Sequence, residues 1–278
     1  MTKYEIFSDQ LPHYENTINN IFNAKITNEL KLEDIYQKSD WVRPSRNYFI
    51  CFTNRSGSTL LALMLARTGA MGAPGEIFNP EPLTNARQKH GVSSFSDFVD
   101  FKLKTTSKQG TFGAKIGVHQ LAYLAKNGYL REEISAPKFI YITRQNIVMQ
   151  AISLYLAWET GAWSSNVANP QQQPEYSLEG ITQQLKSILM IQAQFETFFA
   201  LHQIQPLRIS YEAIDTNLES IALRVCKYVG VVDTSKLQFV RPALKKQRTE
   251  INEEWAARFI SEYKNNISSS PVDFYEFL

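Results

Sequence analysis

The chain has 278 residues, of which 44% are hydrophobic and 20% charged, as expected for a globular protein with a sizeable core. Its formal net charge of +2 is too balanced to predict nucleic-acid binding by bulk electrostatics, so any anion site must be local. This length allows one large α/β domain or two small ones. We expect a single domain over residues 1–278, with residues 1–45 as a helical extension packed on it.

The cysteines and the apolar runs bear on the cellular setting. Cys51 and Cys226 each lie in an apolar run, which favours buried free thiols over a disulfide. The first residues, MTKYEIFSDQ, lack a basic start followed by an apolar core, so no signal peptide is expected. The longest apolar run, Leu60 to Ala66, is too short to cross a bilayer. We therefore expect a cytoplasmic protein without a transmembrane segment.

Hydrophobic periodicity and turn residues predict the elements in chain order. One or two helices are expected between residues 14 and 36. Continuous apolar runs predict strands at 48–53, 111–117, 138–143 and 206–211. Helical spacing predicts helices at 58–67, 95–104, 121–130, 147–159, 180–201, 217–229 and 252–263. Glycine, proline and polar residues predict irregular loops at 69–82 and 164–177.

Strands that alternate with helices indicate an α/β fold with a central, mainly parallel sheet flanked by helices. In such sheets, ligands bind outside the carboxyl ends of the strands. This rule places the segment from Arg55 to Thr59, Arg144 and Tyr211 along one edge of the fold.

The segment TNRSGST, residues 53–59, joins a buried strand to a helix and has the composition of an anion-binding loop. Gly57 can adopt positive φ, and the first amides of the following helix have no intrahelical partners. Such amides, in the field of a helix start, favour an anion. Further donors come from the side chains of Arg55, Ser56, Ser58 and Thr59. The alternative is a capped strand-to-helix turn without a ligand.

The loop differs from an ATP-binding loop. The chain contains no Gly-Lys dipeptide and no G-x-G-x-x-G pattern, which phosphate loops for ATP or dinucleotides require. The strand KFIYIT ends at Arg144 instead of a carboxylate that would hold magnesium. A different anion is therefore expected.

These motifs together resemble a known family. The run RSGSTLL, followed by ARTG and EIFNP, resembles the 5′-phosphosulfate loop of PAPS-dependent sulfotransferases, and most of all the bacterial Stf0-type group, which includes trehalose-sulfating enzymes. Further matches to that group are FGAKIG, YITRQNIVMQAISLYLAWETGAW and LKKQRTEINEEWAARF. The resemblance covers most of residues 45–163 and 207–263.

The resemblance implies a P-loop-like sulfotransferase fold and an activity. The enzyme would move a sulfuryl group from PAPS (3′-phosphoadenosine 5′-phosphosulfate) to a hydroxyl of a carbohydrate, glycolipid or related small molecule, leaving PAP. It implies no metal ion. Members of the family form dimers, so a homodimer is a possibility. Ala73 departs from the trehalose-sulfating pattern, in which a second acid precedes the catalytic glutamate, and this leaves the acceptor open.

The resemblance also assigns the donor-binding residues. Arg55, Ser56, Gly57, Ser58 and Thr59 would bind the 5′-phosphosulfate. Arg144 and Ser153 would bind the 3′-phosphate, although Ser153 alone could be an ordinary small helix residue. Tyr211 would lie at the adenine or be a core tyrosine. Lys246, Gln247 and Arg248, preceded by Lys245, would close over the nucleotide or form a solvated charged run.

For catalysis, the resemblance assigns Glu76 as the general base and Arg55 as the group that stabilises the leaving phosphate oxygen. Glu76 could instead be a surface carboxylate. Lys115 would contact the sulfate or the acceptor, or cap a strand end. His119 and Trp163 are candidate substrate-binding residues, each with ordinary packing as the alternative, while Trp158 is expected in the core.

Two other functions remain open at this stage. A non-catalytic module that binds PAP or PAPS would keep the loop but not turn over. A small-molecule kinase of the P-loop type is disfavoured by the missing lysine.

Overall fold

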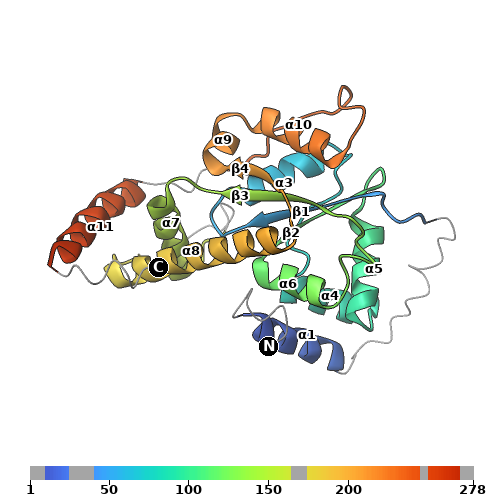
Figure 1. Ribbon diagram of the computed structural model, residues 1–278, viewed down its shortest axis with the longest axis horizontal. Helices are drawn as coiled ribbons and strands as arrows, with labels where there is room; N and C mark the ends of the chain where they lie inside the picture. Colours follow the sequence, from blue (N-terminus) through green and yellow to red (C-terminus); the bar gives the residue numbers. More distant parts are fainter. Residues whose placement is uncertain (1–9, 25–40, 164–173, 245–249, 270–278) are drawn as a thin grey trace. The chain divides into compact units, whose positions relative to one another are not determined.

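The structure, a computed structural model, describes residues 10–24, 41–163, 174–244 and 250–269 (Figure 1). The chain divides into two compact units. Unit 1 comprises Met1–Phe52, Gly57–Thr143 and Gln194–Pro242, and unit 2 comprises Thr53–Ser56, Arg144–Ala193 and Ala243–Leu278. The expected single domain stays a prediction. Within the described ranges, no helix is both long and apolar enough to cross a membrane.

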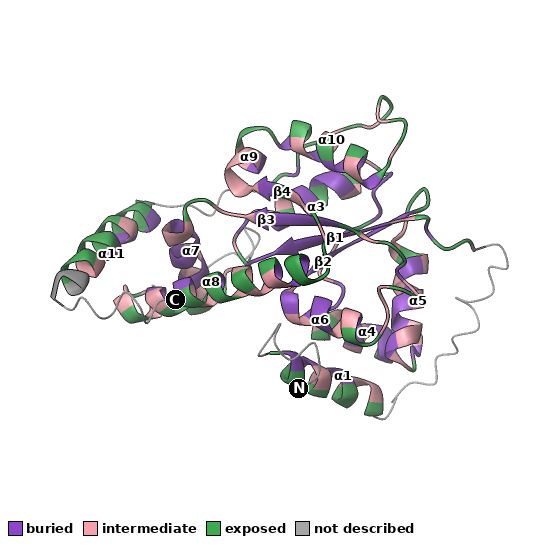
Figure 2. Ribbon diagram, viewed as in Figure 1, coloured by how far each residue is buried: buried purple, intermediate pink, exposed green. Residues whose placement is uncertain are grey.

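The centre of unit 1 is a parallel sheet, as the sequence predicted. Its described strands are β1 (Arg46–Phe52), β2 (Thr111–Ile116), β3 (Lys138–Thr143) and β4 (Leu207–Ser210). They pair in the order β2-β1-β3-β4, and every pairing is parallel. All residues of β2 are buried and β1 is nearly so, because both faces are covered (Figure 2). The predicted α/β fold with flanking helices is confirmed.

Helices cover both faces of this sheet (Figure 1). One face carries α3 (Ser58–Arg67), α9 (Tyr211–Thr216) and α10 (Leu218–Val229), whose apolar side chains pack on alternate strand residues such as Tyr48 and Ile50. The opposite side carries α4 (Pro80–His90), α5 (Phe95–Thr106) and α6 (Val118–Lys126). There, α1 (Leu11–Asn23) packs on α4 and α6. The rest of the predicted 14–36 helical segment lies outside the described residues.

Both cysteines are buried and free, as predicted. Cys51 lies in β1 and Cys226 in α10. Burial raises the pKa of the Cys51 thiol well above its ordinary value and that of Cys226 to about 11, so both are protonated, unreactive core residues.

Unit 2 is helical. Its described helices are α7 (Ile147–Thr160), the first part of α8 (Leu178–Leu201) and α11 (Glu250–Ser269). Their core includes Ile152, Tyr155, Ile188 and Trp255. The expectation that Trp158 packs in a core is wrong: its side chain is 60% exposed, because it lies in the last turn of α7 beyond the residues that α8 and α11 cover.

Two helices escaped sequence analysis, the short α9, which directly follows β4, and α4. The three prolines and three glycines of residues 69–82 predicted a loop, yet that loop ends at Asn79 and α4 begins at Pro80. Pro80 and Pro82 both lie in the first turn, where a helix needs no N–H donors and where the fixed φ of proline is compatible with the helix. Proline here marks a helix start rather than continued irregular chain.

Gly113 is the tightest point of the sheet and yields a stability prediction. A Cβ at this residue would lie 2.2 Å from Cζ of Tyr48, whose hydroxyl donates a hydrogen bond of 2.8 Å to the Met71 carbonyl. We expect Gly113→Ala to lower the free energy of unfolding by about 2–3 kcal/mol, because the buried ring must move. Urea denaturation measures this. In the control Gly75→Ala the new methyl has no atom closer than 3.8 Å, so the change should stay within about 1 kcal/mol. Equal stability of the two variants would contradict the packing.

Candidate active site

The loop of residues 53–59 follows β1 directly and has the backbone of an anion-binding loop. Arg55 has φ 65° and Gly57 has φ 80°, whereas Ser56 between them is outside the positive-φ region. This alternation is typical of backbone nests that turn successive N–H groups to one side, and it is uncommon for an arginine. The first α3 hydrogen bonds run from Leu60 and Leu61 to the Gly57 carbonyl, so the amides of Ser58 and Thr59 have no acceptor within α3, as at any helix start.

A purely structural role of the loop does not explain the surroundings of Gly57 and Ser56. Gly57 has no room for a side chain, and the Ser56 hydroxyl has no partner among the described residues. A Cβ on Gly57 would lie 2.8 Å from Cδ2 of Tyr211, so only glycine fits between the loop and that ring. The Ser56 hydroxyl oxygen is fully buried and has no hydrogen-bond partner among the described residues. Buried hydroxyls without a partner are rare and need an explanation, such as a bound group.

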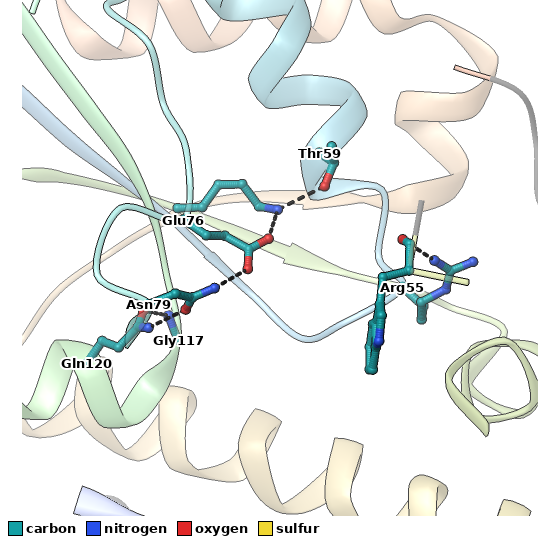
Figure 3. Close-up of polar contacts among 8 residues, drawn as sticks. Arg55, Thr59, Glu76, Asn79, Gly117 and Gln120 are labelled. Atoms are coloured by element: carbon teal, nitrogen blue, oxygen red, sulfur yellow. Dashed lines mark hydrogen bonds and ion pairs between the residues drawn. The ribbon is translucent and has the colours of Figure 1, made fainter. Parts of the chain in front are cut away.

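The side chain of Lys115 joins Thr59 of the loop to Glu76, within unit 1 (Figure 3 labels these two partners). Its Nζ donates to Oγ1 of Thr59 at 2.9 Å and to Oε1 of Glu76 at 2.5 Å, and lies 4.4 Å from the centre of the Phe52 ring. The Lys115 side chain is 4% exposed, whereas that of Glu76 is 40% exposed. We call these residues, together with Asn79, the Lys115 cluster. The buried cation thus faces an anion that solutes can reach.

The backbone holds Glu76 at this place. The residue before it, Gly75, forms a parallel bridge with Ala114, and its carbonyl accepts a hydrogen bond of 2.9 Å from the Lys115 N–H. Two residues earlier, the Ala73 N–H donates to the Thr106 carbonyl at 2.9 Å. Since β2 is the outer strand of the sheet, this segment extends the sheet locally and carries Glu76 to the Lys115 side chain.

The two ionisable groups shift each other. Burial raises the pKa of the Glu76 carboxyl, but the charge of Lys115 and hydrogen bonds from Lys115 and Asn79 outweigh it, so this pKa lies below its ordinary value. Burial lowers the pKa of the Lys115 ammonium, against the opposing effect of Glu76. Glu76 is therefore a carboxylate at neutral pH, held by two donors that leave its remaining lone pairs available.

A second group, the Arg55 cluster, lies within unit 2 and comprises Arg55, Arg144, Ser153 and Trp163; Figure 3 labels its Arg55. Arg55 Nε donates to Oγ of Ser153 at 2.9 Å, and Arg55 Nη1 donates to the carbonyl of Trp163 at 3.3 Å. Its own carbonyl accepts a hydrogen bond of 3.4 Å from Nη1 of Arg144, which directly follows β3. Of the residues predicted to bind the donor, Arg144 and Ser153 therefore both contact Arg55.

Some residues that contact the candidate site had no role in the sequence analysis. Gln150, fully buried on α7, donates to Oγ1 of Thr53 at 2.8 Å and to the Asn54 carbonyl at 2.7 Å, and so holds the start of the loop. Asn79 donates to Oε2 of Glu76 at 2.9 Å. Gln150 lies in the Gln-Ala-x-Ser match, which was the available signal; Asn79 lies in EIFNP, but nothing in that motif indicates its partner.

The other predicted residues fall in varied surroundings. Tyr211 opens α9, half-buried against Gly57. His119, on α6, contacts the Tyr14 ring edge-on at 5.2 Å. Trp163 is 43% exposed and contacts Trp158 edge-on at 4.7 Å. Their roles stay predictions. Lys246, Gln247 and Arg248 lie outside the described residues, as does most of the 164–177 loop.

Comparison with known proteins identifies the family. A family model described as Stf0 sulphotransferase matches residues 47–262, so the chain belongs to the Stf0 sulphotransferase family. The chain is 25% identical over 261 residues to a trehalose 2-sulfotransferase of Mycobacterium tuberculosis, covering 79% of this chain and 96% of that protein. It is 21% identical over 252 residues to a trehalose 2-sulfotransferase of Mycolicibacterium smegmatis, covering 76% and 93%. The family predicted from the motifs is confirmed.

The unequal burial of Lys115 and Glu76 predicts unequal mutational costs. Glu76→Gln leaves a buried ammonium without its anion and should cost about 1–3 kcal/mol in unfolding free energy at pH 7. Lys115→Met removes the buried charge while Glu76 stays solvated, and should cost less or stabilise the protein. Urea denaturation of both variants tests this. A larger cost for Lys115→Met would contradict it.

The same pair predicts a pH dependence. Because the folded-state pKa of Glu76 is depressed, its stabilising effect is complete above the unfolded pKa, about 4.3, and is lost as the pH falls through the folded pKa. The stability deficit of Glu76→Gln should therefore shrink as the pH is lowered below about 4. A deficit that stays constant in acid would rule out this contribution of the carboxylate.

Proposed function

We propose that this chain transfers a sulfuryl group from PAPS to a hydroxyl of a carbohydrate, glycolipid or related small molecule, with Glu76 as general base. The observation that carries the proposal is the Lys115 cluster. It brings a solvent-accessible carboxylate, a buried cation and a hydroxyl of the anion-binding loop into direct contact. Family membership supports the class of reaction.

The loop suits a phosphosulfate. Its backbone conformation, the amides at the start of α3 and the buried Ser56 hydroxyl are all donor groups, and Arg55 adds a fixed positive charge. Arg144 and Ser153, which both contact Arg55, are proposed to bind the 3′-phosphate of the same nucleotide. Tyr211 is proposed on the adenine side, and Lys246, Gln247 and Arg248 as further nucleotide contacts.

The chemistry needs two tasks from the side chains, acceptance of a proton and compensation of the charge on the leaving group. PAPS supplies a sulfuryl group whose bond to the 5′-phosphate oxygen breaks while a new bond forms to the acceptor oxygen. Glu76 accepts the proton of the acceptor hydroxyl as that bond forms. Arg55 and Lys115 balance the charge that remains on the leaving phosphate oxygen, so the proposed reaction uses no metal ion.

The proposed acceptor class rests on the named relatives and on Ala73, which lies close to Glu76 in the chain. Both named relatives act on trehalose, a sugar, which favours a carbohydrate hydroxyl here. Ala73, next to the Glu76 segment, is exposed and removes the acid seen there in the trehalose-sulfating pattern, so a different sugar or glycolipid is proposed. His119 and Trp163 are proposed acceptor contacts.

Donor binding is the first test. Saturating PAP should raise the melting temperature of the protein and give measurable binding heat, and Arg55→Ala should abolish both, because it removes a charge and the contacts to Ser153 and Trp163. The matched control is Arg258→Ala on α11, whose exposed guanidinium pairs with Glu262 and should leave PAP binding unchanged. If saturating PAP produces neither effect in the wild type, the donor assignment fails. ATP with magnesium, bound instead of PAP, would indicate a kinase.

Turnover is the second test. Glu76→Gln should keep PAP binding but slow labelled-sulfate transfer from PAPS by about 10²-fold or more, because the proton acceptor is gone. Glu81→Gln, an exposed residue in the first turn of α4, is the control and should transfer normally. Products from a mixture of sugars and glycolipids can be identified by mass spectrometry. Full turnover in Glu76→Gln would remove Glu76 as base, and PAP binding without transfer to any acceptor would indicate a binding module.

A further inference from the structure

A chain of hydrogen bonds runs from the start of α6 to Glu76 (Figure 3). The Gly117 N–H donates to Oε1 of Gln120 at 2.9 Å. Nε2 of Gln120 donates to Oδ1 of Asn79 at 2.8 Å, and Nδ2 of Asn79 donates to Oε2 of Glu76 at 2.9 Å. Two primary amides thus connect a helix N-terminus to the proposed base.

The direction of this chain is fixed by chemistry. A carboxylate can only accept hydrogen bonds, so the Asn79 nitrogen must face Glu76 and its oxygen must face Gln120. The Gln120 nitrogen then faces Asn79, and its oxygen faces the Gly117 N–H, which can only donate. Every amide therefore donates toward the carboxylate, and the opposite orientation of either side chain would oppose two acceptors or two donors.

The Asn79 side chain makes these hydrogen bonds instead of capping its own helix. It occupies the N-cap position of α4, where an asparagine side chain usually accepts from its own helix and contributes about 1 kcal/mol. Here the side chain makes no such bond. Departures from a local preference of this kind occur where a residue serves a functional site instead.

Gln120 serves Glu76 without contacting it. Gln120 is only 4% exposed, so water does not compete for the two hydrogen bonds of its side chain. With Lys115 on Oε1 and Asn79 on Oε2, both oxygens of Glu76 are held, and the plane of the carboxylate is set from β2 and from the start of α4. Lys115 is the charged group in contact with it. Tyr14 of α1 and His119 of α6, the titratable side chains beside this segment, contact each other.

We propose that Asn79 and Gln120 are positioning residues for sulfuryl transfer: Asn79 orients the Glu76 carboxylate toward the acceptor hydroxyl, and Gln120 acts through Asn79. This inference rests on the proposed function, in which Glu76 is the base. The chain also stabilises the ionised form of Glu76, since each link polarises the next toward the carboxylate.

The test uses near-isosteric variants of the full chain, Asn79→Leu, Gln120→Met and the double variant, with Gln88→Met, an exposed residue of α4, as control. The pKa of Glu76 is measured by NMR of carbon-labelled glutamate, and its resonance is assigned by its absence in Glu76→Gln. We expect the pKa to rise in Asn79→Leu and less in Gln120→Met. The double variant should match Asn79→Leu, because Gln120 acts through Asn79.

Kinetics give the second measurement. With PAPS and an accepted sugar, kcat should fall about ten- to a hundredfold in Asn79→Leu while the Kd for PAP stays unchanged, because a displaced base slows only the chemical step. A purely structural role of Asn79 would lower the melting temperature without changing the pKa of Glu76 or kcat. An unchanged pKa of Glu76 or an unchanged kcat in Asn79→Leu therefore overturns the proposal. Additive effects in the double variant would overturn the order from Gln120 to Asn79.

The two proposals can fail separately. The NMR titration needs no turnover, so a wild-type chain that transfers no sulfuryl group overturns the proposed function while the pKa of Glu76 still reports on the hydrogen-bond chain. Conversely, normal transfer in the wild type with an unmoved Glu76 pKa in Asn79→Leu overturns the positioning role alone.

Discussion

A positive charge buried at the edge of the sheet is the constraint on which the candidate site depends. Lys115 lies in β2, and its side chain is almost wholly removed from water, which is costly for an ammonium unless acceptors and a negative charge surround it. Its surroundings meet that need from three directions, with the Glu76 carboxylate, the Thr59 hydroxyl and the face of the Phe52 ring. The loop after β1 and the segment after α3 are thereby tied to one atom.

The loop of residues 53–59 has a different kind of constraint. It crosses from unit 2 to unit 1 between Ser56 and Gly57. Its first half is tied to α7 through Gln150 and Ser153, and its second half opens α3 beside Tyr211. A single uninterrupted peptide thus has anchors in both units. An arginine with positive φ at its centre carries backbone strain, which persists where surrounding contacts over-determine the conformation.

The sequence predicted those parts of the molecule that depend on local pattern. Buried strands appear as short apolar runs, and all four were found within a few residues, as was the glycine that frees the helix start at Ser58. The family motifs identified Glu76 and Lys115 singly. Their contact was not predicted, because 39 residues separate them in the chain and only the pairing of Gly75 with β2 joins them.

The features that the sequence did not predict correctly also have physical reasons. The helix α4 was hidden by two prolines that are acceptable in a first turn, and Trp158 was placed in a core although it ends its helix beyond the packed face. Asn79 and Gln120 carry neither charge nor apolar periodicity, so their partners are visible only in three dimensions. Amide side chains are as informative as charged ones once their donors and acceptors can be assigned.

The bridge between Gly75 and Ala114 fixes the register of the Glu76 segment against β2, so Glu76 can shift only in steps of a whole residue. A slip of one residue along β2 would move the carboxylate by about 3.3 Å and turn it to the opposite face of the sheet. Insertions or deletions between Gly69 and Gly72 must therefore be absorbed before Ala73, whose N–H is already bonded to Thr106. Insertions or deletions from Pro80 onward do not affect this register. Over evolution, the helix that follows could change its surface, and with it the molecules it meets, while the carboxylate remained in place.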